Sequence, residues 1–138
     1  MSTVLSPQDT LIAAMMLMSA ADRDMADSEL RVIGMTVDLL PVFSGYDRDR
    51  IGRVSQTVVD LLQNEDGLET LIGLIRQGTP EPLRETVYAV ACDVAAADGE
   101  VQQEEARLLE MIRHSLRVDR LAAAAIERGA KARHTKAP

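Results

Sequence analysis

The chain has 138 residues, of which 46% are hydrophobic, as is typical of one compact globular domain. Aromatic residues make up only 2% and Trp is absent, so aliphatic residues and Met must fill the core, which favours helices over a β-sandwich. The net charge of −7 argues against nucleic acid as a partner. The chain shows no signal peptide pattern and no apolar run of about 20 residues, so we expect a cytoplasmic protein that does not insert into membranes.

Ser6-Pro7 followed by Asp9 indicates a helix start, since Pro is favoured at the first helical position and a carboxylate in the first turn. Similar start and stop signals follow along the chain, among them Asp27 and Asp47 as possible caps and a chain break at residues 64–67. No segment alternates as a strand would. We therefore predict helices over residues 7–21, 27–40, 47–61, 68–78, 80–97, 103–116 and 119–130. Residues 131–138 lack apolar periodicity and are predicted to form a disordered basic tail after a domain of residues 1–130.

Two of these helices are apolar on every side rather than along one stripe. The residues of Leu11–Met18 surround the helix axis completely, and those of Val87–Ala97 nearly do so, which predicts two buried central helices. Cys92 lies in the second of them and is interpreted as a buried structural thiol. Asp93 interrupts the same helix, and two interpretations stay open: a position on the flank near solvent or a basic partner, or a buried and paired carboxylate.

An internal repeat becomes visible when the sequence is shifted by 76 positions. Ala20–Asp22 then falls on Ala96–Asp98, and Glu29 falls on Glu105, with charge and apolar phase both preserved. This pattern predicts an all-α single domain of about seven helices with an internal duplication, in which each central helix is followed by an acidic turn and an amphipathic helix.

The acidic turns have a purely structural interpretation. Gly99 would supply a left-handed residue at the end of one central helix, and Gly78 would do the same at the end of the helix before residue 80. Val101 and Met25 would point back at the core, and carboxylates in the following first turns would be favoured by the helix dipole.

A second interpretation is a cation site. Four carboxylates, those of Asp22, Asp24, Asp27 and Glu29, fall within eight residues, and hard cations such as Ca²⁺ and Mg²⁺ bind clustered oxygen ligands. The loop is not an EF-hand, because the central Gly and the terminal Glu of that motif are missing.

The stretch AAADGEVQQEEARLLEMI resembles the TerB-like family of tellurite-resistance domains. Ala97, Asp98, Gly99 and Glu105 match the family pattern, whereas Arg23 replaces the glycine in the first copy. The resemblance implies an all-α fold with two related helix pairs, a role in the stress response including tellurite resistance, and use as a protein-interaction module. It also implies acidic positions that bind a divalent metal, which in this chain are Asp98, Glu100, Glu105, Asp22, Asp24 and Glu29.

The residues give little support to catalysis, and we do not expect an enzyme. The only histidines are His114 and His134, with no zinc-like cluster and no phosphate-binding glycine loop. Two functional interpretations stay open: a stress-response module whose acidic turns bind Ca²⁺ or Mg²⁺, or a metal-free adaptor that binds protein partners or associates with itself.

Overall fold

The structure, a computed structural model, describes residues 5–21 and 27–138. This part of the chain forms seven α-helices and two short 3₁₀ helices and contains no strand, which confirms the predicted all-α fold. In chain order the elements are α1 (Pro7–Ala21), α2 (Asp27–Leu39), η1 (Pro41–Phe43), α3 (Arg50–Leu62), α4 (Gly67–Gly78), η2 (Glu81–Leu83), α5 (Arg84–Ala95), α6 (Gln103–Leu116) and α7 (Arg120–Arg133). None of the described helices has the length and apolar character needed to cross a membrane.

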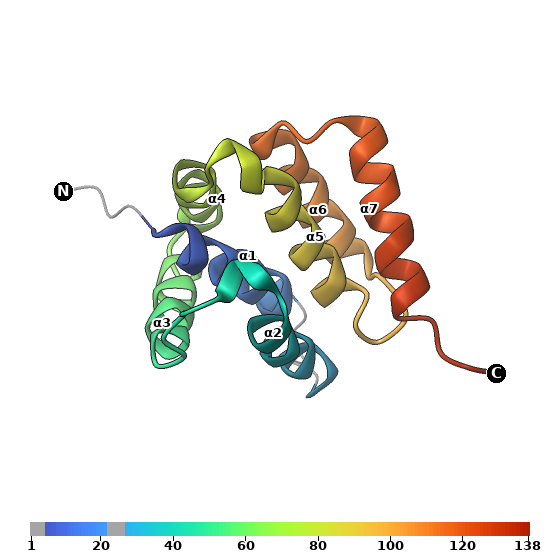
Figure 1. Ribbon diagram of the computed structural model, residues 1–138. Coiled ribbons are helices and arrows are strands. Elements are labelled where there is room, and N and C mark those ends of the chain that lie inside the picture. The colour runs from blue at the N-terminus through green and yellow to red at the C-terminus, as the bar shows by residue number, and fades with distance from the viewer. Residues whose placement is uncertain (1–4, 22–26) are drawn as a thin grey trace.

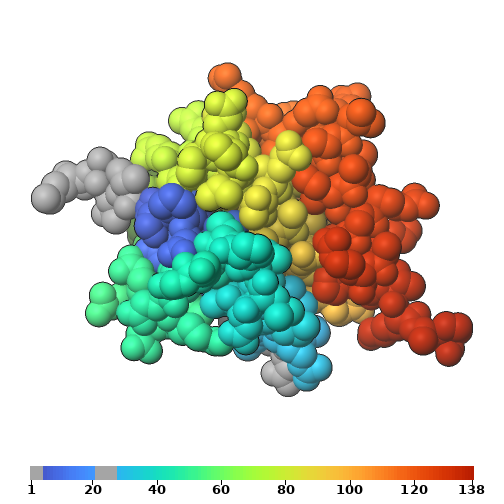
Figure 2. Space-filling view, viewed as in Figure 1, coloured from blue at the N-terminus to red at the C-terminus, as the bar shows by residue number. Residues whose placement is uncertain are grey.

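Helices α1 and α5 pack against each other at the centre of the molecule, as their all-round apolar sequences predict. Leu11, Ile12 and Met15 in α1 are fully buried, and Cys92 in α5 is 3% exposed. Helices α3 and α4 lie on one side of this pair and α6 and α7 on the other, with α2 along one end (Figure 1). The N-terminal half of the chain, coloured blue to green, therefore lies directly against the C-terminal half, coloured yellow to red (Figure 2).

The first residues of helices α2 and α6 are related by the same 76-residue shift as the sequence repeat. Helix α2 begins at residue 27 and α6 at residue 103, and both follow a central helix. The aligned Glu29 and Glu105 are both buried, at 4% and 3% exposure, and so are Ile33 and Leu109. The match weakens toward the helix ends, since Leu40 is 36% exposed and its counterpart Leu116 only 1%. The duplication therefore extends best over the first two turns of each amphipathic helix.

The prediction of a left-handed conformation at Gly78 is wrong. Among the described glycines, that conformation occurs at Gly45 and Gly99. A Cβ atom on Gly78 would instead lie 2.1 Å from Oγ1 of Thr10 and 2.8 Å from the carbonyl oxygen of Leu5. The residue is glycine because the end of α4 touches the start of α1 with no room for a side chain.

An ion pair between the buried Asp9 and the partly exposed Arg50 joins the start of α1 to α3. The side chain of Asp9 is 5% exposed and accepts hydrogen bonds from the Tyr46 hydroxyl at 2.9 Å and from Arg50 Nε at 3.1 Å, with a second bond from Arg50 Nη2. The Asp9 amide donates to Ser6 Oγ at 3.1 Å, so Ser6 caps the helix. This network fixes the angle at which α1 enters the core.

Helix α7 extends beyond the predicted start of the C-terminal tail. Asp119 caps the helix by accepting hydrogen bonds from the amides of Leu121 and Ala122. The helix then continues to Arg133, three residues beyond the expected end at Ala130. Residues 131–133 are therefore helical, and disorder stays a prediction only for the residues that follow.

Candidate functional site

The second acidic turn connects α5 to α6 and presents two carboxylates to solvent. Gly99 has a φ of 93°, so the predicted left-handed residue is confirmed. One carboxylate oxygen of Asp98 accepts a hydrogen bond from the Glu100 amide at 3.0 Å, which closes a local Asx turn. The side chains of Asp98 and Glu100 are exposed. Val101 is 45% exposed, so the expectation that it points into the core is wrong.

Glu105 has a structural task at the start of α6. It is 3% exposed, and its Oε1 accepts a hydrogen bond from the amide of Gln102 at 3.0 Å, as in a capping box. Glu29 occupies the equivalent buried position near the start of α2. Asp22 and Asp24, the remaining candidates from the first turn, lie outside the described residues.

The second turn has oxygen donors of the type that divalent cations bind, but it supplies few of them. Within residues 5–21 and 27–138, no group of three or more His, Cys, Asp or Glu side chains could hold a metal ion. Asp98 and Glu100 alone supply hard, exposed oxygen donors on one short turn. Mg²⁺ commonly binds through one or two carboxylates and keeps several of its waters, so these two residues suit a partly hydrated ion.

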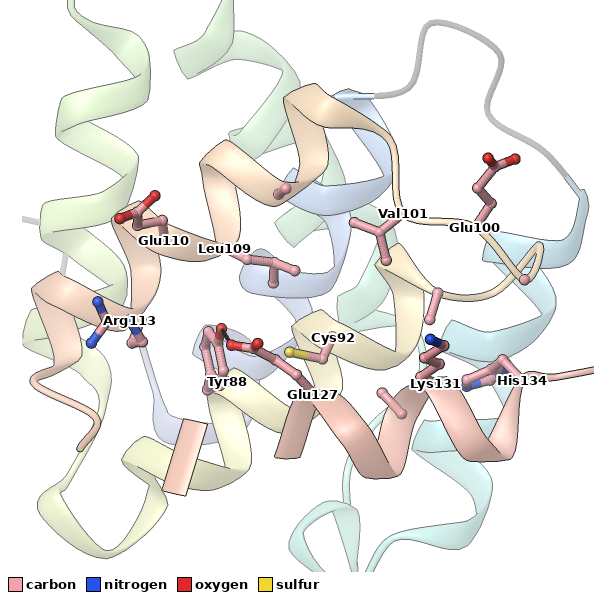
Figure 3. Close-up of a pocket in the computed structure, with 14 residues that line it drawn as sticks. Tyr88, Cys92, Glu100, Val101, Leu109, Glu110, Arg113, Glu127, Lys131 and His134 are labelled. Atoms are coloured by element: carbon pink, nitrogen blue, oxygen red, sulfur yellow. Dashed lines mark hydrogen bonds between the residues drawn. The ribbon is translucent and has the colours of Figure 1, made fainter. Parts of the chain in front are cut away.

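Next to this turn, a cavity of about 640 Å³ lies between α5, α6 and α7 (Figure 3). Buried side chains of all three helices line it, namely Tyr88 and Cys92 from α5, Leu109 from α6 and Ala130 from α7. Glu100 belongs to the same lining, so the acidic turn forms part of the cavity wall.

The cavity lining contains one short hydrogen bond between helices. The Tyr88 hydroxyl donates to Oε2 of Glu127 at 2.6 Å and thereby links α5 to α7. Burial, with this hydrogen bond, raises the pKa of Tyr88 above its ordinary value. Burial also raises the pKa of the Cys92 thiol to about 12, with the nearby Glu127 carboxylate adding to the effect. Both groups are therefore neutral at physiological pH, and Cys92 is the buried, unreactive thiol that its sequence context predicts.

Asp93 connects α5 to the end of α7. Its carboxylate, 20% exposed, accepts hydrogen bonds from Arg133 Nη2 at 2.6 Å and from His134 Nε2 at 3.3 Å. Of the two interpretations left open, the flank position with basic partners is the correct one.

The contact of Asp93 with Arg133 and His134 predicts how truncation of the C-terminus affects stability. Removal of residues 135–138 should change the free energy of unfolding by no more than about 0.5 kcal/mol, because that segment has no apolar face to bury. Removal of residues 131–138 should cost about 1–2 kcal/mol, because it deletes the last turn of α7 and leaves the Asp93 carboxylate without its partners. Urea titrations of the two truncated proteins measure the difference, and equal stabilities would show that the contact with Asp93 contributes nothing.

Two features of the structure were not predicted from sequence. The Asp9–Tyr46–Arg50 network and the Tyr88–Glu127 bond each join residues more than 35 positions apart. A weak signal existed, because Tyr46 and Tyr88 are the two tyrosines in a chain otherwise nearly free of aromatic residues. Buried tyrosines usually place the hydroxyl on a polar partner.

The fold and the turn define a class: an all-α domain in which two related helix pairs, each with a buried central helix, are joined by α3 and α4. The family model described as "Tellurite resistance protein TerB" matches residues 8–128, and the chain belongs to this family. No curated protein and no solved structure matched the chain.

Proposed function

We propose that this chain is a non-catalytic stress-response module of the TerB family, associated with tellurite resistance, whose acidic turn binds a divalent cation. Membership of the family supports the association with tellurite resistance. The observation that supports cation binding is the turn of residues 98–100, in which the exposed carboxylates of Asp98 and Glu100 are separated by one residue.

The geometry of the turn favours a cation in a specific way. The Asx hydrogen bond uses one oxygen of Asp98, which orients the carboxylate and leaves the other oxygen for an ion. The left-handed Gly99 turns the chain between Asp98 and Glu100, so both carboxylates belong to one tight turn. Water would complete the coordination shell, which predicts modest affinity and a preference for Mg²⁺ or Ca²⁺ over softer metals.

Ion-dependent thermal stability tests this proposal. At a cation concentration about ten times the dissociation constant, binding to the folded state alone should stabilise it by about 1.4 kcal/mol. This corresponds to a rise in Tm of roughly 5 °C for a domain of this size. Asp98→Asn should lose most of the rise, because it removes a charged oxygen ligand while keeping a side chain that can form the Asx turn.

Asp47→Asn is the matched control. Asp47 forms the same kind of turn, with its carboxylate accepting a hydrogen bond from the Asp49 amide at 3.0 Å, but Arg48 and Arg50 follow it closely in sequence. This variant should keep the full ion-dependent rise in Tm. If wild-type protein shows no rise with either Mg²⁺ or Ca²⁺, the cation proposal is wrong.

A specific observation favours the second candidate function, a protein-interaction module or homo-oligomer. Leu30, Met35 and Leu39 of α2 are 42%, 52% and 72% exposed, an unusual concentration of large apolar side chains on one surface helix. If this surface mediates self-association, sedimentation velocity should show a concentration-dependent dimer that Leu39→Glu abolishes. Leu121→Glu on α7, where Leu121 is 79% exposed, provides the control and should leave the dimer intact.

A further inference from the structure

The contacts among the helices extend the internal duplication beyond the two helix pairs. Helix α1 packs against α3 as α5 packs against α7, and α2 contacts α5 as α6 contacts α1. Helix α4 is the exception, because it packs against α1, α3 and α6, on the side of the molecule away from α7 (Figure 1). Among the described helices, none packs in the same way against α5, α7 and α2. The second half of the duplication therefore has no counterpart of α4 in the described part of the chain.

The residues of α6 at the contact with α4 recur on α2. Side chains of both helices line one small groove at this contact, namely Glu69, Ile72, Arg107, Glu110, Met111 and His114. The 76-residue shift places Arg31 on Arg107 and Met35 on Met111. Two of the four α6 positions in the groove thus carry the same residue in α2, although α4 covers only the α6 copy.

The corresponding face of α2, formed by Arg31, Met35 and Leu39, is open. Met35 is 52% exposed and Leu39 is 72% exposed, whereas Met111 is partly buried against the core. A Cβ atom on Gly34, next to Met35, would meet nothing within 4 Å. Arg31 is exposed and forms no ion pair with another described residue. This α2 face has the composition of a helix contact, but no described helix covers it.

We propose that the α2 face binds an amphipathic helix of a partner protein, which packs on α2, α5 and α7 as α4 packs on α6, α1 and α3. Helix α4 shows the pattern that such a partner needs, with apolar residues at positions 68, 71, 72 and 75. Charge also contributes, since Glu69 lies in the first turn of α4 and shares the groove with Arg107. A carboxylate at the same place in the partner helix meets Arg31. This inference names the partner of the protein-interaction module proposed above as the second function, and it rests on that proposal.

A peptide with the sequence of α4 is the direct probe, because the duplication predicts that α4 itself fits the α2 face. An isolated helix of this length is marginal in water, so residues 66–78 are used with Gly73→Ala and a hydrocarbon link between positions 70 and 77. A Cβ atom on Gly73 would meet nothing within 4 Å, and Thr70 and Gln77 are exposed, so the packed side of the helix is unchanged. Fluorescence anisotropy of the labelled peptide should show saturable one-to-one binding to wild-type protein.

Variants of the protein locate the binding. Met35→Glu should weaken peptide binding at least tenfold, because it puts a charge at the apolar centre of the α2 face. Arg31→Glu should also weaken binding, and a peptide carrying Glu69→Arg should restore it. Val59→Glu is the matched control, since Val59 is 45% exposed on α3, outside the α2 face, and this variant should bind as wild type does. All three altered side chains are exposed, so the fold, checked by circular dichroism, should be retained.

Absence of binding to wild-type protein, or full binding to Met35→Glu, would overturn the proposal. Sedimentation velocity then separates this failure from that of the interaction function. A concentration-dependent dimer that Met35→Glu abolishes, together with no peptide binding, would show that a second copy covers the α2 face, so the partner helix is wrong and self-association stands. If the dimer is absent as well, the interaction function fails with the partner helix. None of these measurements involves Mg²⁺ or Ca²⁺, so the cation proposal is tested separately.

Discussion

Gly67→Ala is expected to lower the free energy of unfolding by about 3 kcal/mol, and the Tm by roughly 10 °C. Gly67 is the first residue of α4, directly after the turn that follows α3. A Cβ atom there would lie 1.5 Å from the carbonyl oxygen of Leu61 and 2.5 Å from its carbonyl carbon. Because the obstacle is backbone, no side-chain rotation can relieve the overlap, and the turn between α3 and α4 must open.

Gly73→Ala in the same helix is the matched control. A Cβ atom on Gly73 would meet nothing within 4 Å, and the residue lies inside α4. Alanine is favoured over glycine by up to about 1 kcal/mol at an unobstructed helical position, so this variant should be more stable than wild type. Chemical denaturation of both variants measures the contrast. Similar stabilities for the two would show that α3 and α4 can separate at little cost, contrary to the packing described.

Asp9→Asn should have the second large effect, a loss of about 2–3 kcal/mol at neutral pH. The buried carboxylate receives two bonds from Arg50 and one from Tyr46, and an amide cannot accept all of them or balance the guanidinium charge. Because Arg50 is 45% exposed, its charge can return to water in the variant, which keeps the loss below that of a fully buried pair. Asp38→Asn breaks an ion pair whose side chains are 57% and 55% exposed, and should change stability by no more than about 0.5 kcal/mol.

The same network predicts a pH dependence. Burial of the Asp9 carboxyl opposes its ionisation, but the hydrogen bonds from Arg50 and Tyr46 outweigh burial and lower its pKa below the ordinary value of 3.8. Since the folded pKa lies below the unfolded one, the stabilisation is complete above about pH 4 and is lost as the pH falls through the folded pKa. The stability difference between wild type and Asp9→Asn should therefore be constant near neutral pH and shrink in acid. A difference that persists at pH 2 would assign the effect to packing rather than to charge.

Sequence periodicity is sufficient to predict the helices and the central pair. Local signals act over a few residues, so the sequence alone predicts a helix that starts near Asp119, Gly99 as a left-handed residue and Leu11–Met18 as a buried helix. The 76-residue repeat also predicts that Glu29 and Glu105 occupy equivalent places. Both lie near the start of the amphipathic helix that follows a central helix.

Only the tertiary structure decided what those equivalent residues do. Spacing along the chain groups Asp98, Glu100 and Glu105 as one acidic set, but folding exposes the first two and buries the third in a helix cap. The reason is that carboxylates a few residues apart can face solvent or the core according to which neighbouring helix covers them. The sequence pattern places Gly67 in a chain break and Gly78 at a left-handed helix end, whereas both are glycine because another segment passes too close for a Cβ atom. The cavity between α5, α6 and α7 likewise depends on how α7 lies across α5, a contact between segments about 40 residues apart that no local pattern encodes.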